Sequence, residues 1–160
     1  NAVGRRDPDS VGWAALAGLV LVLCAQLASA GAMFALPTQI AGLYSDDAPV
    51  VALAASLLWF AAVFQFSDGI QALANGALRG LKDTSVPAAI TVLAYWGVGF
   101  PLGWWLGLER EWGARGLWIG LIAGLTVAAI LLSARFATRV RSMRRAGIAA
   151  TMAEAPPPQA

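Results

Sequence analysis

Four apolar stretches dominate the sequence, and each is long enough to cross a lipid bilayer, which takes about 20 apolar residues. Charged or proline-containing stretches separate them. Only 12% of the residues are charged and 59% are hydrophobic, whereas soluble domains carry about 25% charged residues. The sequence therefore predicts an all-α, polytopic membrane bundle. Its four transmembrane helices are expected at about residues 11–36, 49–78, 86–108 and 115–136.

The segments at the two ends differ in character from these spans. Residues 1–10 are predicted to be a cytoplasmic loop. Residues 137–160 are basic and then rich in proline and alanine, and they lack apolar periodicity, so we expect a disordered cytoplasmic tail. Because the chain opens at Asn1 within a polar stretch, we expect it to be a fragment of a longer polypeptide.

The basic residues indicate which way the helices cross the membrane. Nine of the eleven fall on one side of the predicted spans, and the positive-inside rule assigns that side to the cytoplasm. Both ends of the chain are therefore predicted to be cytoplasmic. Since the basic clusters follow membrane topology, nucleic-acid binding is not expected. The nine residues are Arg5, Arg6, Arg79, Lys82, Arg135, Arg139, Arg141, Arg144 and Arg145.

Glycines recur every four residues in the third and fourth predicted spans. Such small-residue stripes let helix backbones approach closely in lipid, but they occur in every class of polytopic protein. They therefore predict packing rather than a particular function. Pro101, within the third span, predicts a kink there. The glycines are Gly99, Gly103 and Gly107 in the third span and Gly116, Gly120 and Gly124 in the fourth.

Asp68 is the most informative single residue. The midpoint between Asp47 and Arg79 is near residue 63, so Asp68 lies about five residues, or ~7.5 Å, from the centre of its span. At ~100° per residue, Gln65, Asp68, Gln71 and Asn75 fall within one arc of the helix. We therefore expect a polar face at membrane depth that looks into protein or water.

A charged group at this depth costs between ~3 and more than 10 kcal/mol, and such groups usually mark ion pathways or substrate sites. A proton and a metal cation compete for the same carboxylate, which is the physical basis of ion-coupled transport. The alternative is that Asp68 joins helices through a hydrogen bond. For Gln65, Gln71 and Asn75 a packing role is at least as good an interpretation.

The acidic pair Asp46 and Asp47 precedes the second span. In "SDDAP" an N-cap residue, negative charge at the positive end of the helix dipole and a proline in the first turn all suit a helix start. An acidic patch that attracts organic cations is compatible with this capping role.

Three stretches together resemble the C-terminal part of a multidrug and toxic compound extrusion (MATE) transporter of the NorM type. They are "AVGRRD", "FQFSDGIQALANGALRGLKDTSVPAAITVLAYWGVGFPLGWWLG" and "GARGLWIGLIAGLTVAAILL". The most specific element is the aspartate followed by "GALRGLKDT", a proline and an aromatic, glycine-rich span. The resemblance covers about residues 2–136, and it implies that these helices are the last four of twelve.

The resemblance also implies export of cationic drugs or dyes in exchange for Na⁺ or H⁺ across the inner membrane of a bacterium. Asp68 matches an acidic residue that takes part in cation coupling, with Na⁺ as one ion it can bind; no cofactor is expected beyond the coupling ion. Asp46 and Asp47 match an acidic pair that contacts cationic drugs near the outer mouth. Phe64 stands where some relatives have a tyrosine, so its position offers no hydroxyl ligand. Phe64 is expected to line the cavity with Gln65, Gln71 and Asn75.

Two other functions fit part of the pattern. A flippase for lipid-linked oligosaccharides shares the helical architecture but requires a cationic cavity for phosphate groups, whereas the predicted cavity residue is acidic. A membrane scaffold that transports nothing requires no ionisable group at Asp68. An enzyme is not expected, because the chain has no histidine and a single cysteine, Cys24. The expected partners are small cationic compounds, membrane lipid and an N-terminal lobe of the same polypeptide.

Overall fold

The computed structural model describes residues 8–154, with side chains described for residues 12–146. Every regular element in this part of the chain is a helix. In chain order the elements are α1 (Pro8–Ala35), α2 (Pro37–Gly42), α3 (Ala48–Gly80), α4 (Ser85–Ala94), η1 (Tyr95–Gly99), α5 (Phe100–Trp104), η2 (Trp105–Glu109) and α6 (Ala114–Glu154).

Four of these helical stretches are long and apolar enough to cross a membrane, which confirms the predicted all-α bundle of four spans. The third consists of four consecutive segments, α4, η1, α5 and η2, which we call the third span. The short helix α2, which begins at a proline and lies between α1 and α3, was not predicted. The spans are Gly12–Ala35, Ala48–Gly80, Ser85–Glu109 and Ala114–Ala146.

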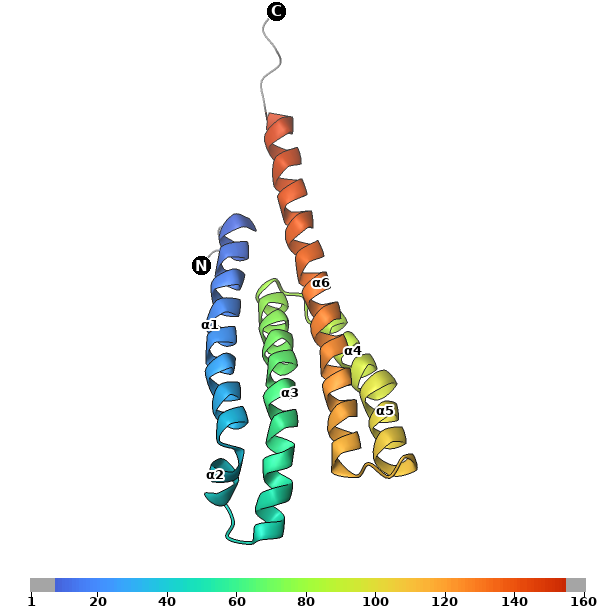
Figure 1. Ribbon diagram of the computed structural model, residues 1–160. Coiled ribbons are helices and arrows are strands. Elements are labelled where there is room, and N and C mark those ends of the chain that lie inside the picture. The colour runs from blue at the N-terminus through green and yellow to red at the C-terminus, as the bar shows by residue number, and fades with distance from the viewer. Residues whose placement is uncertain (1–7, 155–160) are drawn as a thin grey trace, which may run out of the picture.

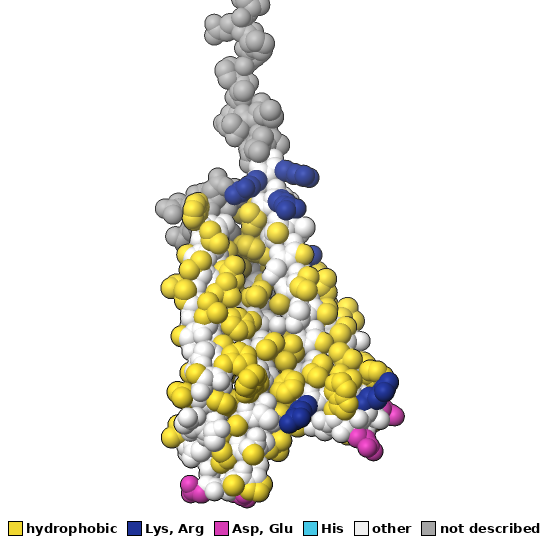
Figure 2. All heavy atoms as spheres, in the orientation of Figure 1, with side chains coloured by type: hydrophobic (Ala, Val, Ile, Leu, Met, Phe, Trp, Pro, Cys, Tyr) yellow, Lys and Arg dark blue, Asp and Glu magenta, His cyan; other side chains and the backbone are white. Residues whose placement is uncertain are grey.

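The four spans lie side by side (Figure 1). α3 packs between α1 and α6, and the third span packs against the other side of α6. The start of α1, the α3–α4 loop and the C-terminal part of α6 lie toward one end of the bundle, and the α2–α3 and η2–α6 connections lie at the other. We call these ends the basic and the acidic end, because Figure 2 shows a group of lysines and arginines near the first and acidic side chains at the second.

The buried interior of this chain is small. Apart from Gln71 and Asp83, its buried side chains are mostly alanine and leucine, and one cluster joins Ala74, Leu78 and Leu132 across α3 and α6. Many large apolar side chains are exposed instead, and they cover the spanning part of the surface (Figure 2). An exposed apolar surface of this extent is typical of a protein that faces lipid or further helices.

The two glycine stripes face each other across the contact between the third span and α6. A Cβ atom at Gly116 would lie 2.5 Å from the Gly107 nitrogen, and one at Gly124 would lie 2.9 Å from the Gly99 Cα. At Gly120 an added Cβ would overlap the Gly103 backbone. The predicted close backbone approach is confirmed, and the stripes are partners of each other.

The third span passes Pro101 without ending. The Phe100 amide donates to the Tyr95 carbonyl, five residues earlier, which is the wide π-helical turn of η1. Proline lacks an N–H and its ring clashes with the carbonyl four residues before it. A wider turn directly before Pro101 accommodates both, and π turns of this kind are frequent at functional sites.

The predicted disordered tail is corrected in part. α6 runs through Glu154, so residues 137–154 are helical. This stretch is rich in arginine, alanine and methionine, which are good helix formers, and it contains no proline. The prediction failed because apolar periodicity measures burial rather than helix propensity. Residues 1–7 and 155–160, which belong to the predicted cytoplasmic loop and tail, lie outside the described residues.

Candidate functional site

Polar contacts on both sides fix the rotation of α3 around Asp68. On the α6 side, the hydroxyls of Ser67 and Thr126 are 2.8 Å apart and hydrogen-bonded. On the α1 side, the Gln26 amide donates to the Gln65 carbonyl, and Gly69 leaves the space that the Gln26 side chain occupies. Because its two sequence neighbours face opposite helices, Asp68 is held in one direction between them.

Asp68 is exposed, and within the described part of the chain it accepts no hydrogen bond and forms no salt bridge. It lies 12 residues, or ~18 Å, from the end of α3 at Gly80. The structure thus presents a carboxylate at membrane depth on a helix that is anchored from both sides. The described residues contain no group of three or more histidine, cysteine or acidic side chains that could hold a metal.

The other residues of the predicted polar face are more buried than Asp68. Gln71 is buried among the helices of this chain, whereas Gln65 and Asn75 are half-buried. The Gln65 side-chain amide donates to the carbonyl of Ala62 on its own helix, at 3.3 Å. Phe64 packs edge-on against Trp118 of α6, with ring centroids 5.6 Å apart. This contact adds to the attachment of α3 to α6 one turn before Asp68.

The acidic pair lies at the other end of α3. Asp47 occupies the N-cap position with extended backbone, and a proline follows in the first turn, as the capping interpretation requires. Its side chain makes no capping hydrogen bond, although its amide is 3.2 Å from the Ser45 hydroxyl. Both Asp46 and Asp47 are exposed. Since 21 residues of helix separate Asp47 from Asp68, about 30 Å at 1.5 Å per residue, the structure does not bring the pair to Asp68.

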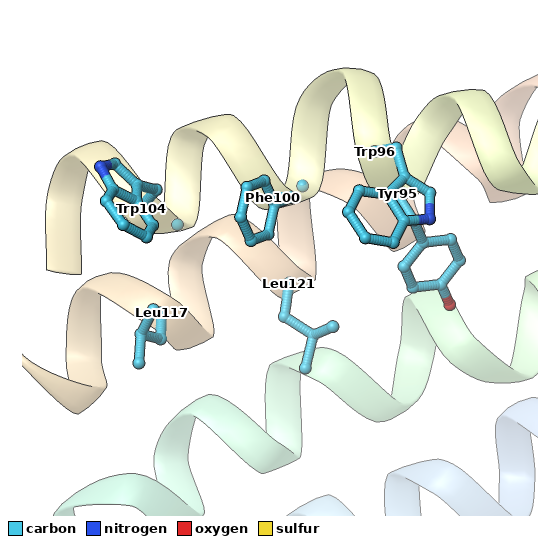
Figure 3. Close-up of a pocket in the computed structure, with 8 residues that line it drawn as sticks. Tyr95, Trp96, Phe100, Trp104, Leu117 and Leu121 are labelled. Carbon is cyan, nitrogen blue, oxygen red and sulfur yellow. The ribbon is translucent and has the colours of Figure 1, made fainter. Parts of the chain in front are cut away.

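A groove of about 460 Å³ lies between the third span and α6. Trp96, Phe100 and Trp104 form one wall, with successive ring centroids 5.4 and 6.0 Å apart, and Leu117 and Leu121 of α6 lie opposite (Figure 3). The half-buried Tyr95 lies at the end of this groove, and its hydroxyl points toward the neighbouring α3.

Asp83 forms a charge cluster at the basic end that was not predicted from the sequence. Its carboxylate accepts hydrogen bonds from Arg135 at 2.8 and 3.1 Å and from Arg139 at 2.8 Å. Only 7% of Asp83 is exposed, and the hydrogen bonds from Arg135 and then Arg139 hold its pKa below the ordinary value. The cluster ties the α3–α4 loop to α6.

The end of α3 explains why Asp83 faces α6. Lys82 adopts a left-handed conformation, with φ of 58°. Its amide donates to the Arg79 carbonyl, and the Asp83 amide donates to the Leu78 carbonyl, each at 3.0 Å. This bonding pattern is a Schellman motif, although the left-handed position is more often glycine. Without that usual glycine, the sequence offered no simple signal for this turn.

Comparison with known proteins identifies the family. The family model described as MatE matches residues 1–105, which is more than half of the chain. The chain belongs to the MatE family. It is 53% identical over 136 residues to a probable multidrug resistance protein NorM of Xanthomonas axonopodis pv. citri, covering 85% of this chain and 30% of that protein. It is 49% identical over 147 residues to the multidrug resistance protein PmpM of Pseudomonas aeruginosa, covering 89% of this chain and 30% of that protein.

A solved structure supports the fold independently. The crystal structure of the eukaryotic MATE transporter AtDTX14 is similar with a TM-score of 0.72 at 24% identity, over 91% of this chain and 34% of that one. This MatE chain is therefore a multi-pass membrane protein that spans about 30% of the length of the curated relatives it matches. The resemblance predicted from the sequence is confirmed at the level of the family.

Proposed function

We propose that this MatE chain is the C-terminal part of a secondary active antiporter. The complete protein would export cationic organic compounds in exchange for Na⁺ or H⁺. The observation that carries the proposal is Asp68, an exposed carboxylate at membrane depth on a helix anchored from both sides. A fold would not hold an ionisable group there for packing alone, because it makes no hydrogen bond within the described residues.

Alternating access then follows from competition at one carboxylate. A coupling ion bound at Asp68 favours the conformation that releases the drug, and a bound drug favours the conformation in which Asp68 has released the ion. One elementary charge that moves down a potential of 100 mV releases ~2.3 kcal/mol, which is the energy available to drive export. In this scheme the remainder of the transport path comes from the rest of the polypeptide.

The proposal includes the placement of the chain in the membrane. The basic end, which carries Arg79, Lys82 and the arginines of α6, would face the cytoplasm of a bacterium across its inner membrane. The names of the relatives, multidrug resistance proteins, support small-molecule export rather than the transfer of lipid-linked sugars. An acidic group at the predicted cavity position also opposes a phosphate-bearing substrate.

The test is Asp68→Asn in the complete transporter, which preserves shape and removes the charge. Efflux of ethidium from cells or vesicles with an imposed ion gradient should fall at least about tenfold, since charge movement at Asp68 is lost. Expression should match the wild type.

The conservative variant Asp68→Glu is the control, because it retains a carboxylate and should retain part of the ion-driven efflux. Wild-type efflux from Asp68→Asn at equal expression would reject the coupling role. That result would favour the scaffold or a transport mechanism that does not use this group.

A further inference from the structure

Tyr95 and Asp68 lie at the same depth in the bundle. Tyr95 is ten residues from the start of the third span at Ser85, about 15 Å along the helix, and Asp68 is about 18 Å from the neighbouring end of α3 at Gly80. Both distances start from the basic end, because the α3–α4 loop joins these two helix ends. The difference of about 3 Å is less than one helical turn.

The Tyr95 side chain points from the third span toward α3, and α6 packs between these two helices. α6 packs against both α3 and the third span. Figure 3 shows the Tyr95 hydroxyl extending past α6 toward α3, away from the wall formed by Trp96 and Phe100. The hydroxyl lies within the electrostatic reach of the Asp68 carboxylate. Tyr95 is also the first residue of the π-helical turn before Pro101, and such turns are frequent at functional sites.

The groups that α1 and α6 place around Asp68 are neutral. α1 contributes Gln26, whose amide nitrogen donates to the Gln65 carbonyl, while its Oε1 has no partner among the described residues. α6 contributes Thr126, which is hydrogen-bonded to Ser67. The nearest arginines on α6 are Arg115, at the acidic end, and Arg135, which is held in the cluster with Asp83. Tyr95 of the third span therefore places a hydroxyl at the depth of Asp68 and directs it toward α3, the helix that carries Asp68.

We propose that Tyr95 is a second member of the coupling site, with its hydroxyl oxygen facing the same monovalent cation or proton as the Asp68 carboxylate. A phenol hydroxyl both donates a hydrogen bond and offers a lone pair. It can therefore donate to the free carboxylate or bind a cation beside it, and it would supply the hydroxyl that Phe64 lacks. This inference rests on the proposed coupling role of Asp68.

Tyr95→Phe in the complete transporter is the test, and Tyr44→Phe is a matched control. These are the two tyrosines of the chain, and Tyr44 is exposed in the connection between α2 and α3. Ethidium efflux is measured against Na⁺ concentration at fixed pH and against pH without Na⁺. In Tyr95→Phe the ion concentration for half-maximal efflux should rise at least about threefold, whereas Tyr44→Phe should match the wild type.

A binding measurement separates a role in the site from a role in packing. The intrinsic fluorescence of the purified transporter, to which the neighbouring Trp96 contributes, is titrated with Na⁺ and with acid. Tyr95→Phe should shift the midpoint for one of the two ions, and in an Asp68→Asn background the same change should have no further effect. If Tyr95 served packing alone, Tyr95→Phe would lower the unfolding temperature and leave the midpoint of the ion titration unchanged.

The two proposals fail in different ways. If Asp68→Asn abolishes efflux while Tyr95→Phe has wild-type midpoints for both ions, the coupling role of Asp68 stands and the role of Tyr95 is wrong. If Asp68→Asn transports normally, the coupling role of Asp68 is wrong, and the role of Tyr95, which rests on it, is wrong as well.

Discussion

Asp68 and Asp83 show how differently two aspartates on neighbouring segments are used. Asp83 is buried at the basic end and is bound by two arginines, so its charge is compensated locally. Asp68 lies deeper, is exposed and has no ion pair among the described residues. A compensated charge joins structural elements, whereas an uncompensated one remains available for a ligand. At the residue scale, this contrast distinguishes a structural carboxylate from a functional one.

Asp83→Asn should destabilise the attachment of the α3–α4 loop to α6, because a neutral amide cannot replace charge-assisted bonds to Arg135 and Arg139. The lowered pKa of Asp83 means that its stabilising effect is fully present above the pKa of the unfolded chain, about 3.9 for aspartate. The effect is lost as the pH falls through the lowered folded-state pKa. The midpoint of thermal unfolding of Asp83→Asn should therefore lie below that of the wild type at pH 7, and the difference should shrink below about pH 4.

Glu109→Gln provides the control for Asp83→Asn. Glu109 is exposed and forms no salt bridge among the described residues. This variant should unfold at the wild-type temperature at pH 7. An Asp83→Asn protein with the same unfolding temperature as the wild type from pH 3 to pH 8 would contradict a stabilising role for the cluster.

At the scale of the elements, the sequence predicts the position and composition of each helix but not which helices pack against each other. Apolar length predicts the four spans, and the spacing of glycines predicts a small-residue stripe on each of two helices. That Gly120 faces Gly103 depends on tertiary packing. The same holds for Tyr95 and Asp68, which lie on helices that pack on opposite sides of α6. It also holds for Asp83, which is 52 residues from its partner Arg135. None of these pairs has a local pattern that could reveal it.

Gly120→Ala tests the contact between the third span and α6. Its methyl group would overlap the Gly103 backbone, which cannot move aside as a flexible side chain could. Overpacking of this kind typically costs about 1–3 kcal/mol. The purified transporter should therefore unfold at a lower temperature, and efflux should decline in proportion to the folded protein.

Gly97→Ala is the matched control for Gly120→Ala. Gly97 lies on the third span, and a Cβ there would meet no atom within 4 Å apart from its chain neighbours and the backbone of its own helix. This variant should be at least as stable as the wild type, because alanine has the higher helix propensity. Equal unfolding temperatures for the two variants would mean that the stripes do not pack as closely as described.

At the scale of the whole molecule, the acidic pair and Asp68 occupy separate regions. About 30 Å of α3 lies between Asp47 and Asp68, several times the ~8 Å Debye length at physiological ionic strength. Charge at one region therefore has little direct effect on the other. Asp46 and Asp47 remain predicted substrate contacts, and their position at the acidic end suits attraction of a cation rather than ion coupling.

The double variant Asp46→Asn/Asp47→Asn in the complete transporter should separate these two roles. Removing two exposed negative charges weakens the attraction of a cationic substrate, so the ethidium concentration for half-maximal efflux should rise about two- to tenfold at low salt. The increase should diminish in high salt, which screens exposed charges. The ion concentration for half-maximal efflux should stay at the wild-type value, since Asp68 and Tyr95 are unchanged.

An uncharged fluorescent substrate is the control, because its efflux should not respond to the double variant. A shift in ion dependence without a change for ethidium would show that the pair belongs to the coupling site despite its distance along α3.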